Sequence, residues 1–187
     1  QTDRMLISLK ELELKGFDVE RFLSKEQVYI NRIVVNGLYL NAFRDKNVPF
    51  DFNRNPKMPQ QLLADLEMPL DIREIKITDS EVLYEQMSVD GSEPGQVPIK
   101  QLNGSVRNVS NVEQQIEENG PMTWDLNANF FGEGKLHLLV EFTKFLTEPD
   151  FAFSGSVQKM DMKVFNQMIE HTEFIRIESG VIQSMSF

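Results

Sequence analysis

The sequence predicts a mainly β fold, an extended or curved antiparallel sheet with two short helices that cap one end. Three observations lead to this fold class. Apolar and polar residues alternate with a period of two along most of the chain, helical patterns are few and short, and small turn residues separate the alternating runs. Such strands have one apolar and one polar face, so one side of the sheet is packed or loaded and the other meets water.

The alternating runs extend from the first residues to the last. The longest are 122–130 and 136–142, and Gly132-Glu133-Gly134 between them predicts a long β-hairpin. A last alternating run begins at Ile175 and continues to the end of the chain. Further turns are predicted at three pairs of small or polar residues: Asn36-Gly37, Asp79-Ser80 and Ser179-Gly180.

The predicted helices are short and lie between strands. Asp18 is a suitable N-cap for a helix over 19–24, and Asp161 for one over 162–170. Pro59 opens a further possible helix over 59–66, because proline is favoured in the first turn.

The length of 187 residues fits a single domain or one multi-strand module. We expect one module over 1–187, with possible sub-repeats at 1–110 and 122–187 and a linker-like segment at 111–121. Residues 45–57 are polar and rich in turn formers, so a loop is expected there. Because strand-like alternation begins almost at the first residue, we expect the chain to be a piece of a longer protein.

Two segments, starting at Leu12 and Ser154, suggest an internal repeat of strand, short helix, strand, turn and strand. In each, a Phe follows an Asp by four residues and a Gly follows the same Asp by nineteen: Asp18, Phe22 and Gly37 in the first, and Asp161, Phe165 and Gly180 in the second. Stacked units would share one core that a single unit cannot form. The apolar residues before the two glycines match only after a shift of one residue, so a bulge is expected. The alternative is that two short helices between strands arose independently.

Composition disfavours several classes of partner. The formal net charge is −10, from 19 basic and 29 acidic residues, and such a surface repels nucleic acid. No basic cluster suits an anionic membrane surface, and no apolar run approaches the roughly 20 residues of a membrane span. The absence of cysteine excludes disulfides, thiolate metal sites and cysteine nucleophiles.

No set of residues predicts catalysis, a metal or a cofactor. The two histidines, His137 and His171, lack a third ligand at suitable spacing. The stretch from Asp51 resembles the start of a calcium loop, but Pro56 stands where glycine is needed. No phosphate-binding loop, nucleophile elbow or zinc-protease motif is present. We therefore expect a non-enzymatic protein.

The second half of the chain concentrates large apolar residues on one face of its predicted strands. One interpretation is an ordinary sheet core, because large apolar side chains are mostly buried. The other is a surface that faces lipid or a partner protein, which the chain's nine methionines also suit. The candidate surface comprises Trp124, Leu126, Phe130, Leu138, Val140, Phe142 and Phe153.

Three phrases resemble the AsmA-like family, including relatives known only as domains of unknown function: INRIVVNGLYLNAFRD (30–45), IREIKITDSEVLYE (72–85) and FIRIESGVIQSMSF (174–187). The resemblance implies a periplasmic protein, attached to the inner membrane only by an N-terminal helix that this chain lacks. It also implies a grooved β-sheet involved in lipid transport or outer-membrane homeostasis, with lipid acyl chains and the rest of the parent chain as partners. It implies no catalytic residue.

A different hypothesis needs no ligand. Unpaired edge strands can add strands from another polypeptide, so the chain could be a structural or protein-interaction module of a larger periplasmic protein.

Overall fold

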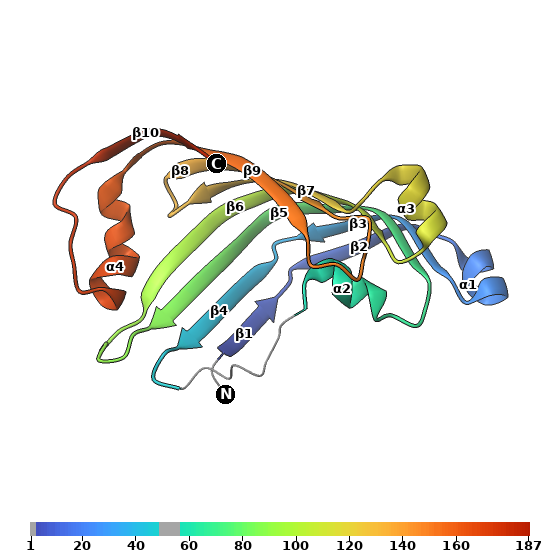
Figure 1. The fold of residues 1–187 in the computed structure, drawn as a ribbon, viewed down its shortest axis with the longest axis horizontal. Helices are drawn as coiled ribbons and strands as arrows, with labels where there is room; N and C mark the ends of the chain where they lie inside the picture. The colour runs from blue at the N-terminus through green and yellow to red at the C-terminus, as the bar shows by residue number, and fades with distance from the viewer. Residues whose placement is uncertain (1–2, 49–56) are drawn as a thin grey trace.

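The computed structural model describes residues 3–48 and 57–187, which form one curved ten-stranded sheet with short helices at its ends (Figure 1). Strands make up 55% of the described residues and helices 18%, which confirms the mainly β class. Residues 49–56 lie outside the described part, and with them most of the predicted 45–57 loop and the start of the calcium-like stretch.

The strands are β1 (Asp3–Ser8), β2 (Glu11–Phe17), β3 (Val28–Asn36), β4 (Tyr39–Asp45), β5 (Leu70–Met87), β6 (Gly95–Ser110), β7 (Thr123–Phe130), β8 (Gly134–Phe142), β9 (Phe151–Asp161) and β10 (Val181–Ser186). The helices are α1 (Val19–Lys25), α2 (Pro59–Ala64), α3 (Glu113–Asn119) and α4 (Asn166–Thr172), with a 3-10 turn, η1 (Met162–Phe165), directly before α4.

The strand order is β1-β4-β5-β6-β7-β8-β9-β10, with β2 beside β3 and β3 beside β5. Most neighbours are antiparallel, and the predicted hairpin is confirmed, since β7 and β8 pair from Thr123 with Glu141 to Phe130 with Gly134. The sheet is nevertheless mixed, because β3 and β4 both run parallel to β5. They lie end to end along the 18 residues of β5, and β1 and β2 line up beside them.

Two of the predicted turns are wrong: Asn36-Gly37 and Asp79-Ser80 are kinks within continuing strands. Gly37 has φ +65 and Asp79 has φ +46, so the backbone bends there without reversing. The long partner strand explains this outcome. Gly37 N–H donates to Thr78 O at 3.0 Å, and Glu81 N–H donates to Leu38 O at 2.8 Å, so both halves of the bent strand stay on β5.

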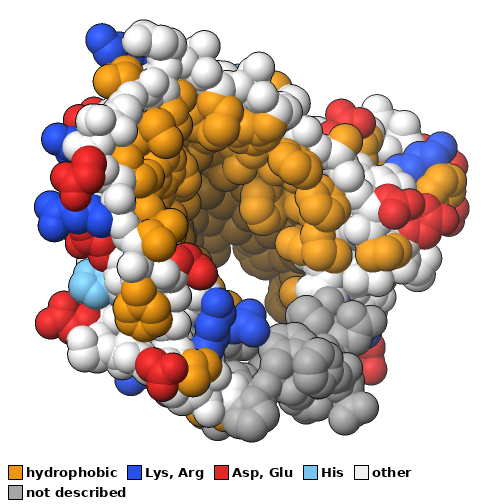
Figure 2. Space-filling view, turned by 60° about the vertical axis from the view of Figure 1, so that its left-hand side comes forward, with side chains coloured by type: hydrophobic (Ala, Val, Ile, Leu, Met, Phe, Trp, Pro, Cys, Tyr) orange, Lys and Arg blue, Asp and Glu red, His pale blue; other side chains and the backbone are white. Residues whose placement is uncertain are grey.

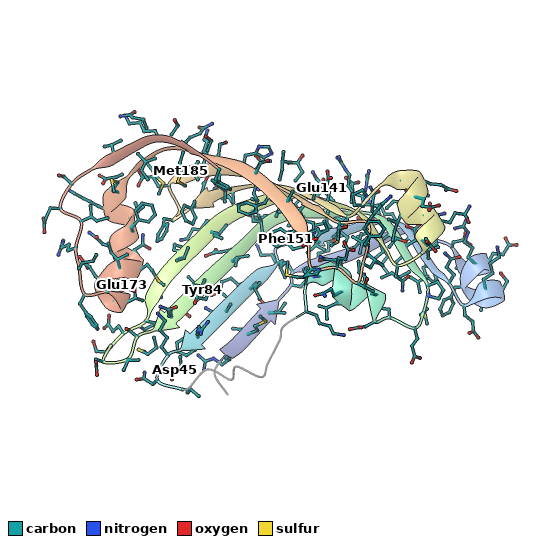
Figure 3. The ribbon with its side chains drawn as sticks, in the orientation of Figure 1. Asp45, Tyr84, Glu141, Phe151, Glu173 and Met185 are labelled. Carbon is teal, nitrogen blue, oxygen red and sulfur yellow. The ribbon has the colours of Figure 1, made fainter. Side chains whose placement is uncertain are left out.

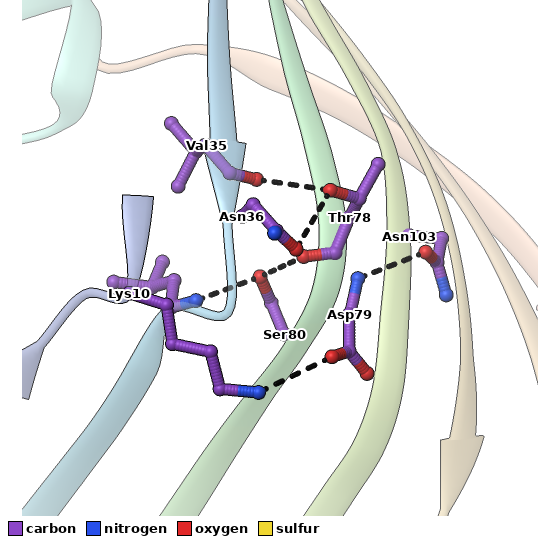
Figure 4. A network of polar contacts seen from close by, with 8 residues as sticks. Lys10, Val35, Asn36, Thr78, Asp79, Ser80 and Asn103 are labelled. Carbon is purple, nitrogen blue, oxygen red and sulfur yellow. Dashed lines mark hydrogen bonds and ion pairs between the residues drawn. The ribbon is translucent and has the colours of Figure 1, made fainter. Parts of the chain in front are cut away.

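A network of polar contacts connects neighbouring strands at the level where they bend (Figure 4). Ser80 Oγ accepts from Leu38 N–H at 3.1 Å and donates to Thr78 O at 2.9 Å. Lys10, between β1 and β2, reaches past Gly37, between β3 and β4, to Asp79 on β5, with 3.3 Å between its Nζ and Oδ2. A side chain at Gly37 would collide with the Lys10 stem, so this contact needs glycine.

A second line of irregularity lies nearer α3. Gly16 in β2 has φ +65 and Asn108 in β6 has φ +56. In β5 the apolar face changes parity here, because Ile72 and Ile75 pack in the same core although three positions separate them. The register between neighbouring strands is the same on both sides of this line, so the strands bend together here without an inserted residue.

Three helix and strand assignments from the sequence need correction. The two predicted helices do not cap the same end, since α1 lies at one end of the long axis and α4 at the other (Figure 1). The linker-like 111–121 contains α3, which buries Ile116 and connects neighbouring strands of one sheet. The expected strand at Ile175 is absent, because Asn166 binds both backbone groups of Ile177 and holds this segment against α4.

The residues that define the proposed repeat occupy partly matching places. Asp18 caps α1 by accepting from Arg21 N–H, and Asp161 caps η1 by accepting from Lys163 N–H. Phe22 packs on Phe17, whereas Phe165 packs on Phe131 and Phe130. In both units a helix connects two antiparallel neighbours. The glycines differ, because Gly37 follows the return strand and Gly180 precedes it.

Ser80→Ala should lower the free energy of unfolding by about 1–3 kcal/mol. The variant leaves the Leu38 N–H unpaired beside a side chain that is only 2% exposed, and an unsatisfied buried donor carries a cost of that order. Chemical denaturation measures the change. Ser154→Ala, at an exposed position of β9, is the matched control and should change the stability little. Equal stability of the two variants would contradict the role given to Ser80.

Candidate functional site, an apolar trough on the concave face

The concave face of the sheet is a continuous apolar surface, because the strand register places apolar residues in rows across the strands. We define the apolar trough by three such rows. One row comprises Leu14, Ile33, Ile75, Val106, Trp124, Val140 and Phe153. The next comprises Leu12, Val35, Ile77, Gly104, Leu126, Leu138 and Gly155. The third comprises Ile7, Leu40, Val82, Ile99 and Phe130.

Figure 2 looks into the trough and shows a deep hollow lined by hydrophobic side chains, with charged side chains mostly on the surrounding surface. The strand ribbons arch over this hollow in Figure 1. Phe151 lies beneath the arch and Glu141 outside it (Figure 3). The two faces of the same strands therefore differ in chemistry as one-sided alternation requires.

All seven predicted surface residues lie on this concave face, but they differ in burial. Phe142 is 3% exposed and packs against Trp124, with 5.2 Å between the ring centroids. Leu126 and Leu138 face each other and are half-buried. Phe153 is 57% exposed, near the rim. The set therefore extends from a packed core outward to solvent, and neither interpretation of it applies to every member.

The trough is packed at its two ends and open between them. At one end, Leu63 of α2 joins a cluster with Ile30, Ile72, Phe142 and other residues of the sheet. At the other end, Met160 is at the centre of a second cluster that includes side chains of η1 and α4. Leu126, Leu138 and Ile77 belong to neither cluster. The middle of the apolar face thus has no covering layer among the described residues.

The accessible surface reflects this opening. It measures 11792 Å², whereas a compact monomer of 21.6 kDa has about 9,200 Å². A sheet folded against a second complete layer would bury much of this difference.

Polar contacts fix the two helices that close the ends. Gln60 of α2 is fully buried, and its Nε2 donates to the carbonyl oxygens of Glu148 and Asp150 at 3.0 and 3.3 Å. At the other end, Ser88 Oγ donates to Thr172 O at 3.1 Å and holds α4 to the end of β5. The described part of the trough therefore has defined ends and an open long side.

The convex face carries the charges. Arg32 pairs with Glu74 at 2.6 Å, and His137 Nε2 lies 3.0 Å from Asp125 Oδ1. Both members of the histidine pair are substantially exposed and lie on the face opposite the trough. His171 is in the last turn of α4. Within 3–48 and 57–187, no three potential metal-binding side chains gather.

One carboxylate is buried at the α3 end, outside the trough. Asp71 of β5 is 1% exposed, and burial raises the pKa of its carboxyl group. The charges of Arg73 and Arg21 and a hydrogen bond with Ser110 oppose this rise in pKa. Arg73 lies 3.5 Å from Asp71 and also donates to Gln115 of α3 at 2.9 Å, which connects α3 to the sheet.

Comparison with family models, with curated proteins and with solved structures finds no match to this chain. In the described part of the chain, no helix is long and apolar enough to cross a membrane.

Sequence reasoning missed the half of the trough that the first strands supply. Leu14, Ile33 and Ile75 lie in the same row as Trp124. Their alternation is interrupted by the two lines of kinks and bulges, so no long run marks them as one face. A sequence signal that could have identified them is the change in spacing of apolar residues, from three positions between Ile72 and Ile75 to two between Ile75 and Ile77.

Asp71→Asn should become increasingly stabilising, relative to the wild type, as pH rises from about 4 to 8. A carboxyl group whose folded-state pKa is raised favours the folded state fully only below its unfolded pKa of about 3.9, and that benefit is lost as pH rises through the folded pKa. Denaturant unfolding over this range measures the difference. Asp90→Asn, in an exposed loop, controls for the general loss of a charge. A difference that stays constant with pH would contradict the burial effect.

Proposed function

We propose that this chain is a non-enzymatic lipid-holding module whose apolar trough shelters acyl chains. The single observation that carries the proposal is the open middle of the concave face, where half-buried apolar residues lie between two packed ends. Acyl chains suit such a surface because their binding needs continuous apolar contact and few polar groups. Each methylene removed from water contributes about 0.8 kcal/mol.

The composition of the floor supports a linear ligand. Gly104 and Gly155 lie in the middle row, flanked by Leu126 and Leu138. The Leu126 side chain covers Gly104 and the Phe187 ring covers Gly155, so hydrocarbon continues along the middle row, while Phe153 and Phe151 stand at one rim. A continuous apolar floor fits an extended hydrocarbon chain better than a compact, polar metabolite.

The resemblance to the AsmA-like family extends this proposal to a cellular role. In this proposal the chain belongs to a larger periplasmic protein attached to the inner membrane, and the trough forms part of a route for lipids that maintains the outer membrane. An open long side, rather than an enclosed cavity, suits a lipid that enters or leaves sideways. The acidic surface, with its net charge of −10, argues against nucleic acid as a partner.

A second candidate function is a structural or protein-interaction module without its own ligand. The outer edges of β1 and β2 favour it, because they pair with no other strand within the described residues. In that case a neighbouring polypeptide, and not lipid, would cover the apolar face. Lipid analysis of the purified protein separates the two functions.

Native mass spectrometry of protein purified from cells should show bound lipid, and Phe153→Asp should reduce the lipid-bound fraction about tenfold or more. The new charge would lie against the acyl chain, where an unpaired carboxylate loses hydration. Because Phe153 is 57% exposed, the substitution leaves the packed cores intact.

Leu139→Asp is the matched control for this experiment. Leu139 is 42% exposed on the convex face of β8 and should retain wild-type lipid. Lipid-free wild-type protein, or equal loss of lipid in both variants, would reject the trough as the binding site.

A further inference from the structure

Within residues 3–48 and 57–187, the outer edge formed by β1 and β2 pairs with no other strand, and it has the properties of an interface. The two strands lie end to end from residue 3 to residue 17, with a break after Ser8 and a second irregularity at Gly16. Met5 is 70% exposed and Ile7 63%, and four more large apolar side chains along the edge are exposed: Leu6, Leu9, Leu12 and Leu14. An unpaired edge with this composition is a template for another strand.

The edge has only part of the usual protection. Proteins block free edges with proline, charged side chains such as lysine, inward-pointing charges, bulges or very short strands. Residues 4–17 include Lys10 and Lys15 but no proline, and the charged side chains that these residues place in the two strands lie on the convex side, so none of them points toward the trough. The segment carries three basic and two acidic residues, a net charge of +1, whereas the whole chain carries −10. The edge is thus a place where two acidic molecules can approach with little repulsion.

The edge also matches itself. In an antiparallel pair with its twofold axis between Leu9 and Lys10, residue numbers on opposite strands add up to 19. Met5 then faces Leu14 of the second copy, and Ile7 faces Leu12, all on the concave side. The two kinks coincide at the axis, so each bent edge follows the other. A shift of one residue would place apolar residues opposite polar ones, and a shift of two would separate the kinks.

The convex side tolerates this register. Leu6 faces Glu13 of the second copy, and Ser8 faces Glu11. The direct like-charge contact is between Arg4 and Lys15, both at the solvent side. Lys15 already pairs with Glu13 of its own chain at 3.0 Å, and Arg4 lies over the Phe43 ring at 5.0 Å. Exposed pairs of this kind change stability little.

We propose that two copies of this chain associate through their β1–β2 edges, in antiparallel register about the kink, and join their troughs into one continuous concave surface. The association is isologous and closed, because each copy supplies the same edge. The edge of β10 is a poorer partner, since it has six residues and no kink to match. This pairing does not depend on what the trough holds.

The chain's lack of cysteine allows a direct test with the double variant Met5→Cys plus Leu14→Cys. Within one chain these positions are nine residues apart on the same edge, roughly 30 Å, which is too far for a disulfide. Across the proposed pair they face each other, so mild oxidation should give covalent dimers with two disulfides. Met5→Cys alone and Leu14→Cys alone should give few dimers, but a mixture of the two should give heterodimers.

Analytical ultracentrifugation of the unmodified chain gives the second readout. We expect a reversible dimer of the wild-type chain at tens of micromolar and a monomer for Ile7→Lys. Because Ile7 is exposed, this substitution should not unfold the chain. Circular dichroism confirms that this variant is folded. A wild-type chain that stays monomeric at several hundred micromolar overturns the proposal. Open-ended higher oligomers would indicate pairing of the β1–β2 edge with β10. Abundant disulfide-linked dimers of the Met5→Cys variant alone would indicate another register. Either result also overturns the proposal.

Discussion

Backbone pairing along β5 organises the whole molecule. Its 18 residues pair with β6 on one side and with both β3 and β4 on the other, so the kinks of three strands must occur at matching levels. Ser80 satisfies the backbone where the strands bend, and Lys10 and Asp79 connect the neighbouring strands across the line. The bend directs the apolar side chains of successive strands toward a common axis, and the trough follows from this convergence.

The same geometry leaves the chain with more apolar surface than it can cover. α2 and α4 are each short and pack only at the ends, so the centre of the concave face has no protein layer among the described residues. Exposed apolar surface on this scale usually marks a binding site. The two proposed partners, acyl chains on the concave face and a second copy at the β1–β2 edge, would remove apolar surface from water in independent ways. The first acts on side chains of the floor, and the second on the unpaired backbone of an edge.

The alternation of apolar and polar residues predicted those elements that depend only on residues close together in the sequence. The alternation from Thr123 to Phe142 identified the β7–β8 hairpin and the shared face of Trp124 and Val140. The Asn36-Gly37 pair could not reveal whether the strand turns or bends, because glycine permits both and the distant partner β5 decides. The segment at Ile177 has strand-like alternation, yet the Asn166 side chain binds its backbone. Likewise, only the register shows that Leu14 and Trp124 share a row.

The single tryptophan provides the most direct test, because Trp124 lies within the trough and no other residue contributes indole fluorescence. The measurement is titration of the delipidated protein with a fatty acid brominated along its chain, compared with the unbrominated acid. Bromine quenches indole only at close contact. The trough model predicts saturable quenching by the brominated acid alone, competed away by excess unbrominated acid. Absence of quenching at saturating ligand, or equal quenching by both acids, would contradict the claim that the concave face holds acyl chains.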